Sequence, residues 1–239
     1  MSENETDGRH WTMVIDSDKC TGCGACVVAC HAENNVPIAD EGQVIQGRAN
    51  HWIRIERYWE GTYPNVKARF LPVMCQQCGE APCEPVCPVY ATYHSTEENL
   101  NVMVYARCVG TRYCANNCPY RVRSFNFYEP KFEGALVEQL NPDVTVRSAG
   151  VMEKCTFCIQ RIRRADQKAT VEGRALEDGE VQPACAQACP PKAIVFGDAS
   201  DPESQVAKLV EGNERRYQLL HNLGTKPAVY YLKGGASNV

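Results

Sequence analysis

The sequence predicts an α+β fold in which short strands and a few helices surround four cysteine-rich segments, with an inserted β-hairpin and a C-terminal tail. Three observations lead to this prediction. The 15 cysteines of the 239 residues fall into four blocks. Short apolar runs of the strand type stand next to these blocks, and two longer segments have the periodicity of a helix. With 44% hydrophobic residues, the chain can bury a core.

The expected elements follow from local patterns. Residues 51–59 (HWIRIERYW) alternate apolar and polar side chains, which predicts one strand of a hairpin inserted between the first two cysteine blocks. Residues 158–169 have a helical pattern with several basic residues, and residues 201–222 predict an amphipathic helix. Pro, Gly and polar residues predict a loop over 129–150, and residues 223–239 are expected to wrap over a partner or the body. Short strands are expected at Met13–Ile15, Val102–Tyr105 and Ala193–Phe196.

The cysteine spacing indicates metal sites rather than disulfides. An odd number of cysteines cannot pair completely, and disulfide frameworks have no reason to repeat gaps of two and three residues. The thiolates must stay reduced during assembly, which predicts assembly in the cytoplasm. The four blocks are Cys20, Cys23, Cys26 and Cys30; Cys75, Cys78, Cys83 and Cys87; Cys108, Cys114 and Cys118; and Cys155 and Cys158 with Cys185 and Cys189.

Iron–sulfur clusters are the cofactors that this spacing favours. Three cysteines at two-residue spacing curl the backbone around one cluster, and in the run C-x2-C-x2-C-x3-C-P the last cysteine binds a neighbouring cluster, so the blocks must work in pairs. The first block has this spacing, and three blocks end in Cys-Pro. Zinc is the alternative, because the split fourth block taken alone resembles a zinc ribbon. Four blocks together favour iron.

The third block lacks one cysteine, and Thr111 stands where the pattern calls for it. A cubane corner with no protein thiolate tends to lose its iron, so this site predicts a [3Fe-4S] cluster at the high-potential end of the series. The alternative is that the Thr111 hydroxyl or a water completes a [4Fe-4S] cluster, although a hydroxyl is a poor ligand for this soft chemistry.

Composition excludes several function classes. A net charge of −4 gives no electrostatic reason to bind nucleic acid or an anionic membrane. No run approaches the about 18 apolar residues of a membrane helix, and the first nineteen residues are polar and acidic rather than signal-like. No Ser-His-Asp set, phosphate loop or paired carboxylate site stands out. We therefore expect no catalytic residues and no enzyme activity of the chain by itself.

Several longer phrases resemble the iron–sulfur subunit of the complex iron–sulfur molybdoenzyme family, which includes dimethyl sulfoxide, polysulfide, tetrathionate and nitrate reductases. They are the block order, the Thr in CVGTRYC, CQQCGEAPCEPVCP and YQLLHNLGTKPAVYYL. GRANHWIRIERYWEG, LNVMVYARCVGTRYC and NNCPYRVRSFNFY are most similar to the branch of alternative complex III and polysulfide-reductase-like complexes. The resemblance runs from about residue 11 to residue 233.

The resemblance implies two ferredoxin-like dicluster modules with three [4Fe-4S] clusters and one [3Fe-4S] cluster. The implied parts are an outer module of 11–38 and 151–200, an inserted hairpin of 39–65, an inner module of 66–128, a loop of 129–150, and a C-terminal helix and partner-wrapping tail of 201–239. The implied ligand sets are Cys20, Cys23, Cys26 and Cys189 for the first cluster; Cys155, Cys158, Cys185 and Cys30 for the second; Cys75, Cys78, Cys83 and Cys118 for the third; and Cys87, Cys108 and Cys114, with Thr111 at the vacant position, for the [3Fe-4S] cluster.

The resemblance also implies a role and partners. The chain is expected to relay electrons between a molybdoenzyme-like catalytic subunit, or an adjacent redox subunit, and a polytopic, NrfD-like membrane subunit that handles quinone or quinol, in a respiratory or photosynthetic complex. Cytochrome c subunits are a further class of partner. The expected location is peripheral, on the bacterial cytoplasmic membrane through these partners, with the periplasmic face favoured. A free polyferredoxin carrier and a zinc-bearing assembly module are the rival functions.

The roles of other side chains near the cysteine blocks have two possible interpretations. Four aromatic residues are expected to pack and exclude water rather than tune electron transfer: Tyr113, Tyr120, Phe125 and Phe127. Five arginines are expected either to meet an acidic partner or to form a solvated basic face: Arg121, Arg123, Arg161, Arg163 and Arg164. His31, His51 and His94 are not expected to bind a cluster, because every cluster already has its ligands.

Overall fold

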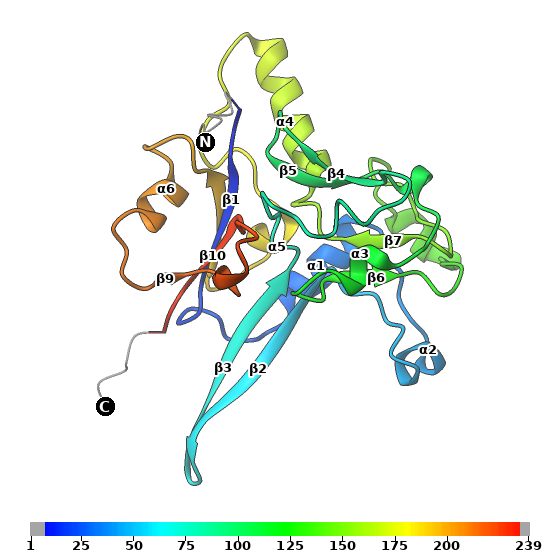
Figure 1. Ribbon diagram of the computed structural model, residues 1–239, viewed down its shortest axis with the longest axis horizontal. Coiled ribbons are helices and arrows are strands. Elements are labelled where there is room, and N and C mark those ends of the chain that lie inside the picture. Colours follow the sequence, from blue (N-terminus) through cyan, green and yellow to red (C-terminus); the bar gives the residue numbers. More distant parts are fainter. Residues whose placement is uncertain (1–7, 235–239) are drawn as a thin grey trace.

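The computed structural model describes residues 8–234 and has a mixed α and β structure with short helices (Figure 1). Its strands form one four-stranded sheet in the order β8-β1-β10-β9 and three two-stranded sheets, β2-β3, β4-β5 and β6-β7. This is the α and β mixture that the sequence predicts. The helices are α1 (Ala25–Glu33), α2 (Glu41–Ile45), α3 (Tyr113–Asn116), α4 (Ile159–Glu172), α5 (Ala184–Gln187) and α6 (Gln205–Val210), with 3-10 turns η1 (Tyr105–Arg107), η2 (Gly134–Gln139) and η3 (His221–Leu223).

The four-stranded sheet joins the two ends of the described chain. Its central strand β1 (Trp11–Asp16) is buried along almost its whole length. β1 pairs antiparallel with β8 (Ile194–Asp198) on one side and parallel with β10 (Val229–Leu232) on the other, and β9 (Arg216–Tyr217) closes the edge. The strands predicted around 13–15 and 193–196 are confirmed. The predicted tail thus contributes an inner strand of the body, and residues 235–239 lie outside the described residues.

The amphipathic helix predicted over 201–222 is wrong. The helix in this region, α6, covers only Gln205–Val210, and it begins at Ser204, whose Oγ accepts a hydrogen bond from the Ala207 amide at 3.1 Å. The helix ends at Glu211, whose backbone is extended with φ −68° and ψ 131°, and Gly212 follows with a positive φ of 65°. The chain then extends into β9, because its backbone groups find partners in the sheet rather than in another helical turn.

A long hairpin projects from the body (Figure 1). Its strands are β2 (Ile53–Thr62) and β3 (Asn65–Met74), ten residues each, paired from Ile53↔Met74 to Thr62↔Asn65. The strand predicted at 51–59 is confirmed, and the hairpin extends past 39–65 to Met74, while that range also holds α2. Its root is buried and its outer part is exposed.

Two further ladders connect the cysteine segments. β4 (Thr92–Ser95) pairs with β5 (Leu100–Met103), and β6 (Arg123–Phe125) pairs with β7 (Met152–Lys154). The strand expected at 102–105 therefore lies slightly earlier in the chain. The β6-β7 ladder spans the segment 129–150, which is irregular apart from η2, and it leads directly into Cys155.

Helix α4 confirms the helix predicted at 158–169. It begins directly after Cys158, and Gly173 ends it with a positive φ of 66°. Its arginines pair within the chain: Arg161 with Glu33, Arg163 with Glu98 and Arg164 with Asp143. Arg163 and Arg164 remain 58% and 71% exposed, so they lie on the solvated face that was one of the two predictions, with their charges paired within the chain, whereas Arg161 is only 27% exposed.

The core is built around the cysteines. The larger cluster of buried apolar residues contains cysteines from all four blocks together with strand residues such as Met13, Ile15, Ile53 and Met152. The cysteine segments thus pack against the strands in one interior.

Candidate iron–sulfur centres

The first cysteine group lies between the N-terminal loop and the fourth block. Cys20, Cys23, Cys26 and Cys189 line one cavity, which the hairpin residues Ile55 and Pro72 also border. The loop turns through Gly22 and Gly24, both with positive φ, just before α1 begins. A Cβ on Gly22 would overlap the ring of Phe70, so the loop can lie this close to the hairpin only with glycine at that position.

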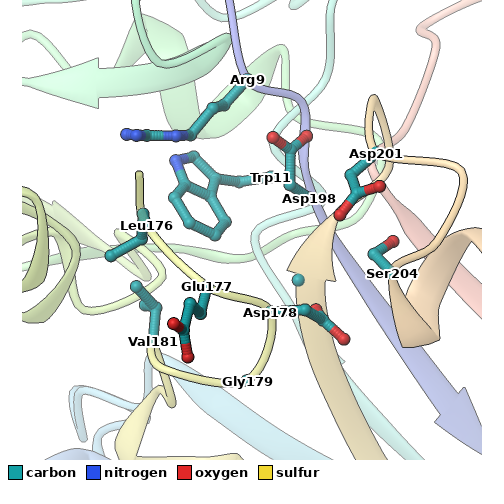
Figure 2. Close-up of a pocket in the computed structure, with 11 residues that line it drawn as sticks. Arg9, Trp11, Leu176, Glu177, Asp178, Gly179, Val181, Asp198, Asp201 and Ser204 are labelled. Atoms are coloured by element: carbon teal, nitrogen blue, oxygen red, sulfur yellow. The ribbon is translucent and has the colours of Figure 1, made fainter. Parts of the chain in front are cut away.

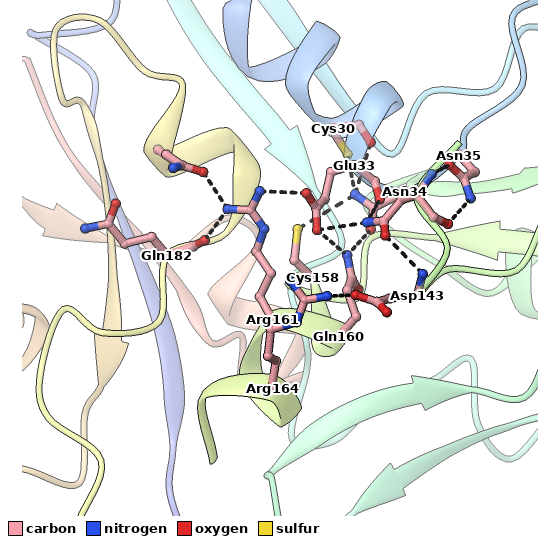
Figure 3. Close-up of polar contacts among 12 residues, drawn as sticks. Cys30, Glu33, Asn34, Asn35, Asp143, Cys158, Gln160, Arg161, Arg164 and Gln182 are labelled. Carbon is pink, nitrogen blue, oxygen red and sulfur yellow. Dashed lines mark hydrogen bonds and ion pairs between the residues drawn. The ribbon is translucent and has the colours of Figure 1, made fainter. Parts of the chain in front are cut away.

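The second group combines the end of the first block with the fourth. Burial raises the pKa of Cys30 well above its ordinary value, and the neighbouring thiols of Cys155, Cys158 and Cys185 raise it further. The side-chain amide of Asn34 donates to both Cys30 Sγ at 3.6 Å and Cys158 Sγ at 3.7 Å (Figure 3). One buried amide therefore links sulfur atoms 128 residues apart in the chain.

Charged side chains enclose the second group. Arg161 Nη2 contacts Glu33 Oε2 at 2.6 Å, and Gln160 donates to Glu33 Oε1 at 2.9 Å and to Asn34 Oδ1 at 3.2 Å (Figure 3). Arg164 pairs with Asp143 of the 129–150 segment. This network attaches α4 to the C-terminal end of α1, which holds Cys30 and the donor Asn34 in one place.

The third group comes from the second and third blocks. Cys75, Cys78, Cys83 and Cys118 line a cavity under Tyr120. Burial raises the pKa of Cys78 to about 12 and the pKa of Cys83 to about 11. The Tyr120 hydroxyl lies 2.6 Å from Thr225 Oγ1, so the C-terminal segment covers this site.

The fourth group contains three cysteines. Cys87, Cys108, Cys114 and Thr111 line one cavity. The Ala91 amide donates to Cys87 Sγ at 3.1 Å, and the Met152 amide donates to Cys108 Sγ at 3.4 Å. Although burial raises the pKa of Cys87, backbone N–H groups around it lower the pKa to a value below the ordinary one. Thr111 thus lies at a three-cysteine site, whose lining also includes Thr92 and Arg112.

The four groups follow one another through the molecule. The thiol of Cys26 raises the pKa of Cys185, which brings the first group next to the second. The thiol of Cys75 raises the pKa of Cys155, and Gln77 Nε2 donates to the Cys155 carbonyl at 2.9 Å, which brings the second next to the third. The guanidinium of Arg123 is close to cysteines of the third and fourth groups. The order is therefore first, second, third, fourth.

The donor chemistry fits iron–sulfur clusters. Burial and mutual repulsion oppose ionisation of most of these thiols, so a cationic core is what would let them bind as thiolates. Soft sulfur donors in sets of four, four, four and three, with backbone N–H groups aimed at sulfur, are the ligands and hydrogen bonds that iron–sulfur clusters use. In the structure, the cysteines of each predicted ligand set lie together. Their role as cluster ligands stays a prediction.

A further cavity lies away from the cysteines, beside Trp11 and Asp198 (Figure 2). Its carboxylates accept hydrogen bonds from backbone amides: Asp198 Oδ1 from His10 at 2.8 Å, and Asp178 Oδ2 from Gln205 at 3.0 Å. These hydrogen bonds hold neighbouring loops against the edge of the four-stranded sheet. The residues that line this cavity include no cysteine.

The other predicted residues divide into buried and exposed ones. Tyr120 is buried, whereas Tyr113 and Phe127 are exposed, and Phe125 packs edge-on against Phe127 with ring centroids 4.7 Å apart. The prediction that these rings pack in the interior is therefore confirmed for Tyr120 and Phe125 and is wrong for Tyr113.

The histidines bond to other side chains. His31 Nε2 lies 3.2 Å from His51 Nδ1, and His94 Nε2 lies 2.8 Å from Asn99 Oδ1. Residues that sequence reasoning missed are the donor Asn34, the buried Asn101, whose Oδ1 accepts a hydrogen bond from Arg123, and the buried cation Lys154. The signal for Asn34 is its position four residues after Cys30, one helical turn along α1.

Two family models match the chain. Residues 66–134 match the 4Fe-4S dicluster domain, and residues 11–32 match the 4Fe-4S binding domain. The first covers the second and third cysteine blocks, and the second covers the first block. These matches identify ferredoxin-type iron–sulfur segments over the first three of the four cysteine blocks.

Curated relatives resemble the chain over nearly its full length. The menaquinone reductase iron-sulfur cluster-binding subunit of Nitratidesulfovibrio vulgaris is 46% identical over 227 residues, which cover 93% of this chain and 88% of the relative. The Hdr-like menaquinol oxidoreductase iron-sulfur subunit 1 of Archaeoglobus fulgidus is 36% identical, over 98% of this chain and 87% of the relative. The arsenate respiratory reductase iron-sulfur subunit ArrB of a Shewanella species is 34% identical, over 92% and 95%.

Proposed function

The chain belongs to the iron–sulfur subunits of molybdoenzyme-type oxidoreductase complexes, and from this membership we propose that it carries electrons between a catalytic subunit and a quinone-handling membrane subunit. Two of the relatives are named for menaquinone or menaquinol, which supports the quinone end of this path. The chain itself makes and breaks no substrate bond.

The proposed cofactors are three [4Fe-4S] clusters, held by the first three cysteine groups, and one [3Fe-4S] cluster, held by Cys87, Cys108 and Cys114. Two observations support this set. The cysteines of the first, third and fourth groups each line a separate cavity, and those of the second group are close enough to raise the pKa of Cys30. The fourth cavity has Thr111 in place of a fourth cysteine.

Each cluster type supplies one-electron redox chemistry when bound. The residues of the chain hold the four sites in series, so an electron that enters at one end has a neighbouring site at every step. Buried side chains such as Phe157, Met152 and Tyr120 exclude water from the interior sites. Backbone and amide N–H groups aimed at sulfur stabilise the added negative charge on reduction.

The proposed partners are a molybdoenzyme-like catalytic subunit beside the first and second sites, and a polytopic membrane subunit beside the third and fourth. In residues 8–234, no helix combines the length and apolar character needed to cross a bilayer. We assign the chain a peripheral position, on the membrane through its partners.

The observation that carries the cluster assignment is the three-cysteine cavity with Thr111 at its edge. We test it with Thr111→Cys, measured by electron paramagnetic resonance (EPR) and iron analysis of anaerobically purified protein. The variant is expected to gain about one iron per chain and to lose the [3Fe-4S] signal of the oxidised wild type.

Thr111→Val is the matched control, because it removes the hydroxyl without adding a ligand. It is expected to keep the three-iron signal and the wild-type iron content. The assignment would be contradicted if the wild type had no three-iron signal and Thr111→Val contained less iron than the wild type. That result would show that the Thr111 hydroxyl completes a four-iron cluster.

A further inference from the structure

Two cations face one another in the β6-β7 ladder at the centre of the molecule. Arg123 of β6 is the direct cross-strand partner of Lys154 of β7. Arg123 is only 8% exposed and Lys154 is fully buried. Like charges directly opposite each other weaken an antiparallel pair, and a buried charge is costly unless an opposite charge compensates it. This ladder therefore needs negative charge nearby.

Carboxylates close to the ladder are engaged elsewhere. Within residues 8–234, Glu153 pairs with Arg147, and Glu84 lies 3.8 Å from His94 and accepts a hydrogen bond from Asn101. The Lys154 ammonium donates to the Cys155 carbonyl at 3.0 Å, which is a neutral acceptor. Side-chain carboxylates thus do not supply the compensating charge.

The guanidinium of Arg123 instead contacts a cysteine of the third group. Its Nη2 lies 3.0 Å from Cys83 Sγ, 2.8 Å from Thr92 Oγ1 and 2.7 Å from Asn101 Oδ1. Burial lowers the pKa of Arg123, but the surrounding cysteines raise it to a net value above the ordinary one. Four hydrogen-bond acceptors within one buried pocket, counting Met103 Sδ at 3.9 Å, fix the direction of this side chain.

The two cations reach different cysteine groups. The Arg123 guanidinium contacts Cys83 Sγ of the third group and is also close to the Cys114 thiol of the fourth. Lys154 directly precedes Cys155 of the second group, its ammonium contacts the Cys155 carbonyl, and its charge also acts on Cys83 of the third group. The pair therefore stands at the junction through which an electron passes from the second group to the third and on to the fourth.

We infer that Arg123 and Lys154 are positioning charges that raise the reduction potentials of the clusters beside the β6-β7 ladder. Arg123 acts on the third and fourth clusters and Lys154 on the second and third, while the first cluster is outside their reach. The inference rests on the proposed function, because it concerns clusters held by the proposed ligand sets. Each step moves one electron and makes or breaks no bond. Reduction adds one negative charge to a cluster, and a fixed positive charge at close range stabilises that product.

The test is an EPR-monitored redox titration of the purified, cluster-loaded protein. Arg123→Gln is expected to lower the midpoint potentials of the third and fourth clusters, and Lys154→Gln those of the second and third. The first cluster is expected to keep its potential in both variants. Arg123→Lys and Lys154→Arg keep the charge and are expected to restore potentials close to the wild type. Arg121→Gln removes the same charge from an exposed position two residues away and is expected to shift no midpoint.

Three results would overturn the inference. They are unchanged potentials of the third cluster in both Gln variants, an equal shift of all four clusters including the first, and loss of the third cluster in Arg123→Lys as well as Arg123→Gln. The last would make the role of Arg123 structural. A wild type without iron or reducible centres is a different outcome, because it contradicts the proposed function itself.

Discussion

Replacement of Glu153 by Gln is expected to destabilise the protein strongly. Glu153 and Arg147 form an ion pair with both side chains 0% exposed and Arg147 Nε 2.9 Å from Glu153 Oε1. Trp52 Nε1 donates to the same carboxylate at 2.9 Å and Asn126 Nδ2 at 2.5 Å. The amide keeps the shape of the side chain but leaves the guanidinium buried without a counter-charge.

The expected cost is about 3–5 kcal/mol, the usual effect of removing one partner of a buried pair. For a chain of this length, 1 kcal/mol shifts the melting temperature by about 2–4 °C, so Glu153→Gln is expected to melt roughly 6–20 °C lower. Arg147 also donates to the carbonyls of Asn34 at 2.8 Å and Asn35 at 3.1 Å, so the loss should loosen the end of α1 near the second cysteine group.

The assay is thermal unfolding under anaerobic conditions at one scan rate, followed by circular dichroism and by the visible absorbance of the clusters. Glu203→Gln is the matched control, because Glu203 and Lys208 form an exposed pair with side chains 84% and 58% exposed. That control is expected to change stability by at most about 1 kcal/mol. If Glu153→Gln has the same melting temperature as the control and the wild type, the reasoning about this buried network is refuted.

Two further substitutions test individual sites. Asn34→Leu removes the amide that donates to Cys30 Sγ and Cys158 Sγ, so redox titration should find a lower midpoint for the second cluster, and thermal unfolding should show a loss of about 1–2 kcal/mol; an unchanged midpoint would count against these hydrogen bonds. Gly110→Ala places a Cβ against the Gly150 carbonyl oxygen at a positive φ of 72°, so EPR should show loss of the [3Fe-4S] signal while the four-iron signals remain; an intact three-iron signal would contradict this geometry.

The cysteine spacing predicted iron–sulfur segments, which the family models confirm over residues 11–32 and 66–134. The family came from the resemblance of longer phrases, such as CQQCGEAPCEPVCP and YQLLHNLGTKPAVYYL, and the relatives confirm it. Alternation over residues 51–59 predicted β2, and short apolar runs beside the cysteine blocks predicted β1 and β8, because a half-buried or buried strand leaves its pattern in a few consecutive residues.

A local sequence pattern could not predict which strands, far apart in the chain, pair in one sheet. The last strand, Val229–Leu232, lies parallel to Trp11–Asp16, more than 200 residues away. Nothing in the apolar run itself says which strand will bind its backbone. The same sheet takes residues 216–217 as an edge strand, which is why a helix over 201–222 was wrong.

Buried cations were missed for a related reason. The sequence predicts Arg123 at the surface, either facing an acidic partner or on a solvated basic face, whereas it is buried next to cysteines up to 48 residues away in the chain. A charged residue is ordinarily exposed, so sequence reasoning places it on the surface unless its counter-charge is known. Here the surroundings are sulfur atoms, whose charge depends on what they bind.

Metal and sulfide analysis of anaerobically purified protein tests the central claim most directly. If the cysteine groups hold three four-iron clusters and one three-iron cluster, the protein contains about 15 iron atoms per chain, a similar amount of acid-labile sulfide and no stoichiometric zinc. Zinc in these sites, or far fewer iron atoms in fully folded protein, would contradict the claim that the chain is an iron–sulfur electron carrier.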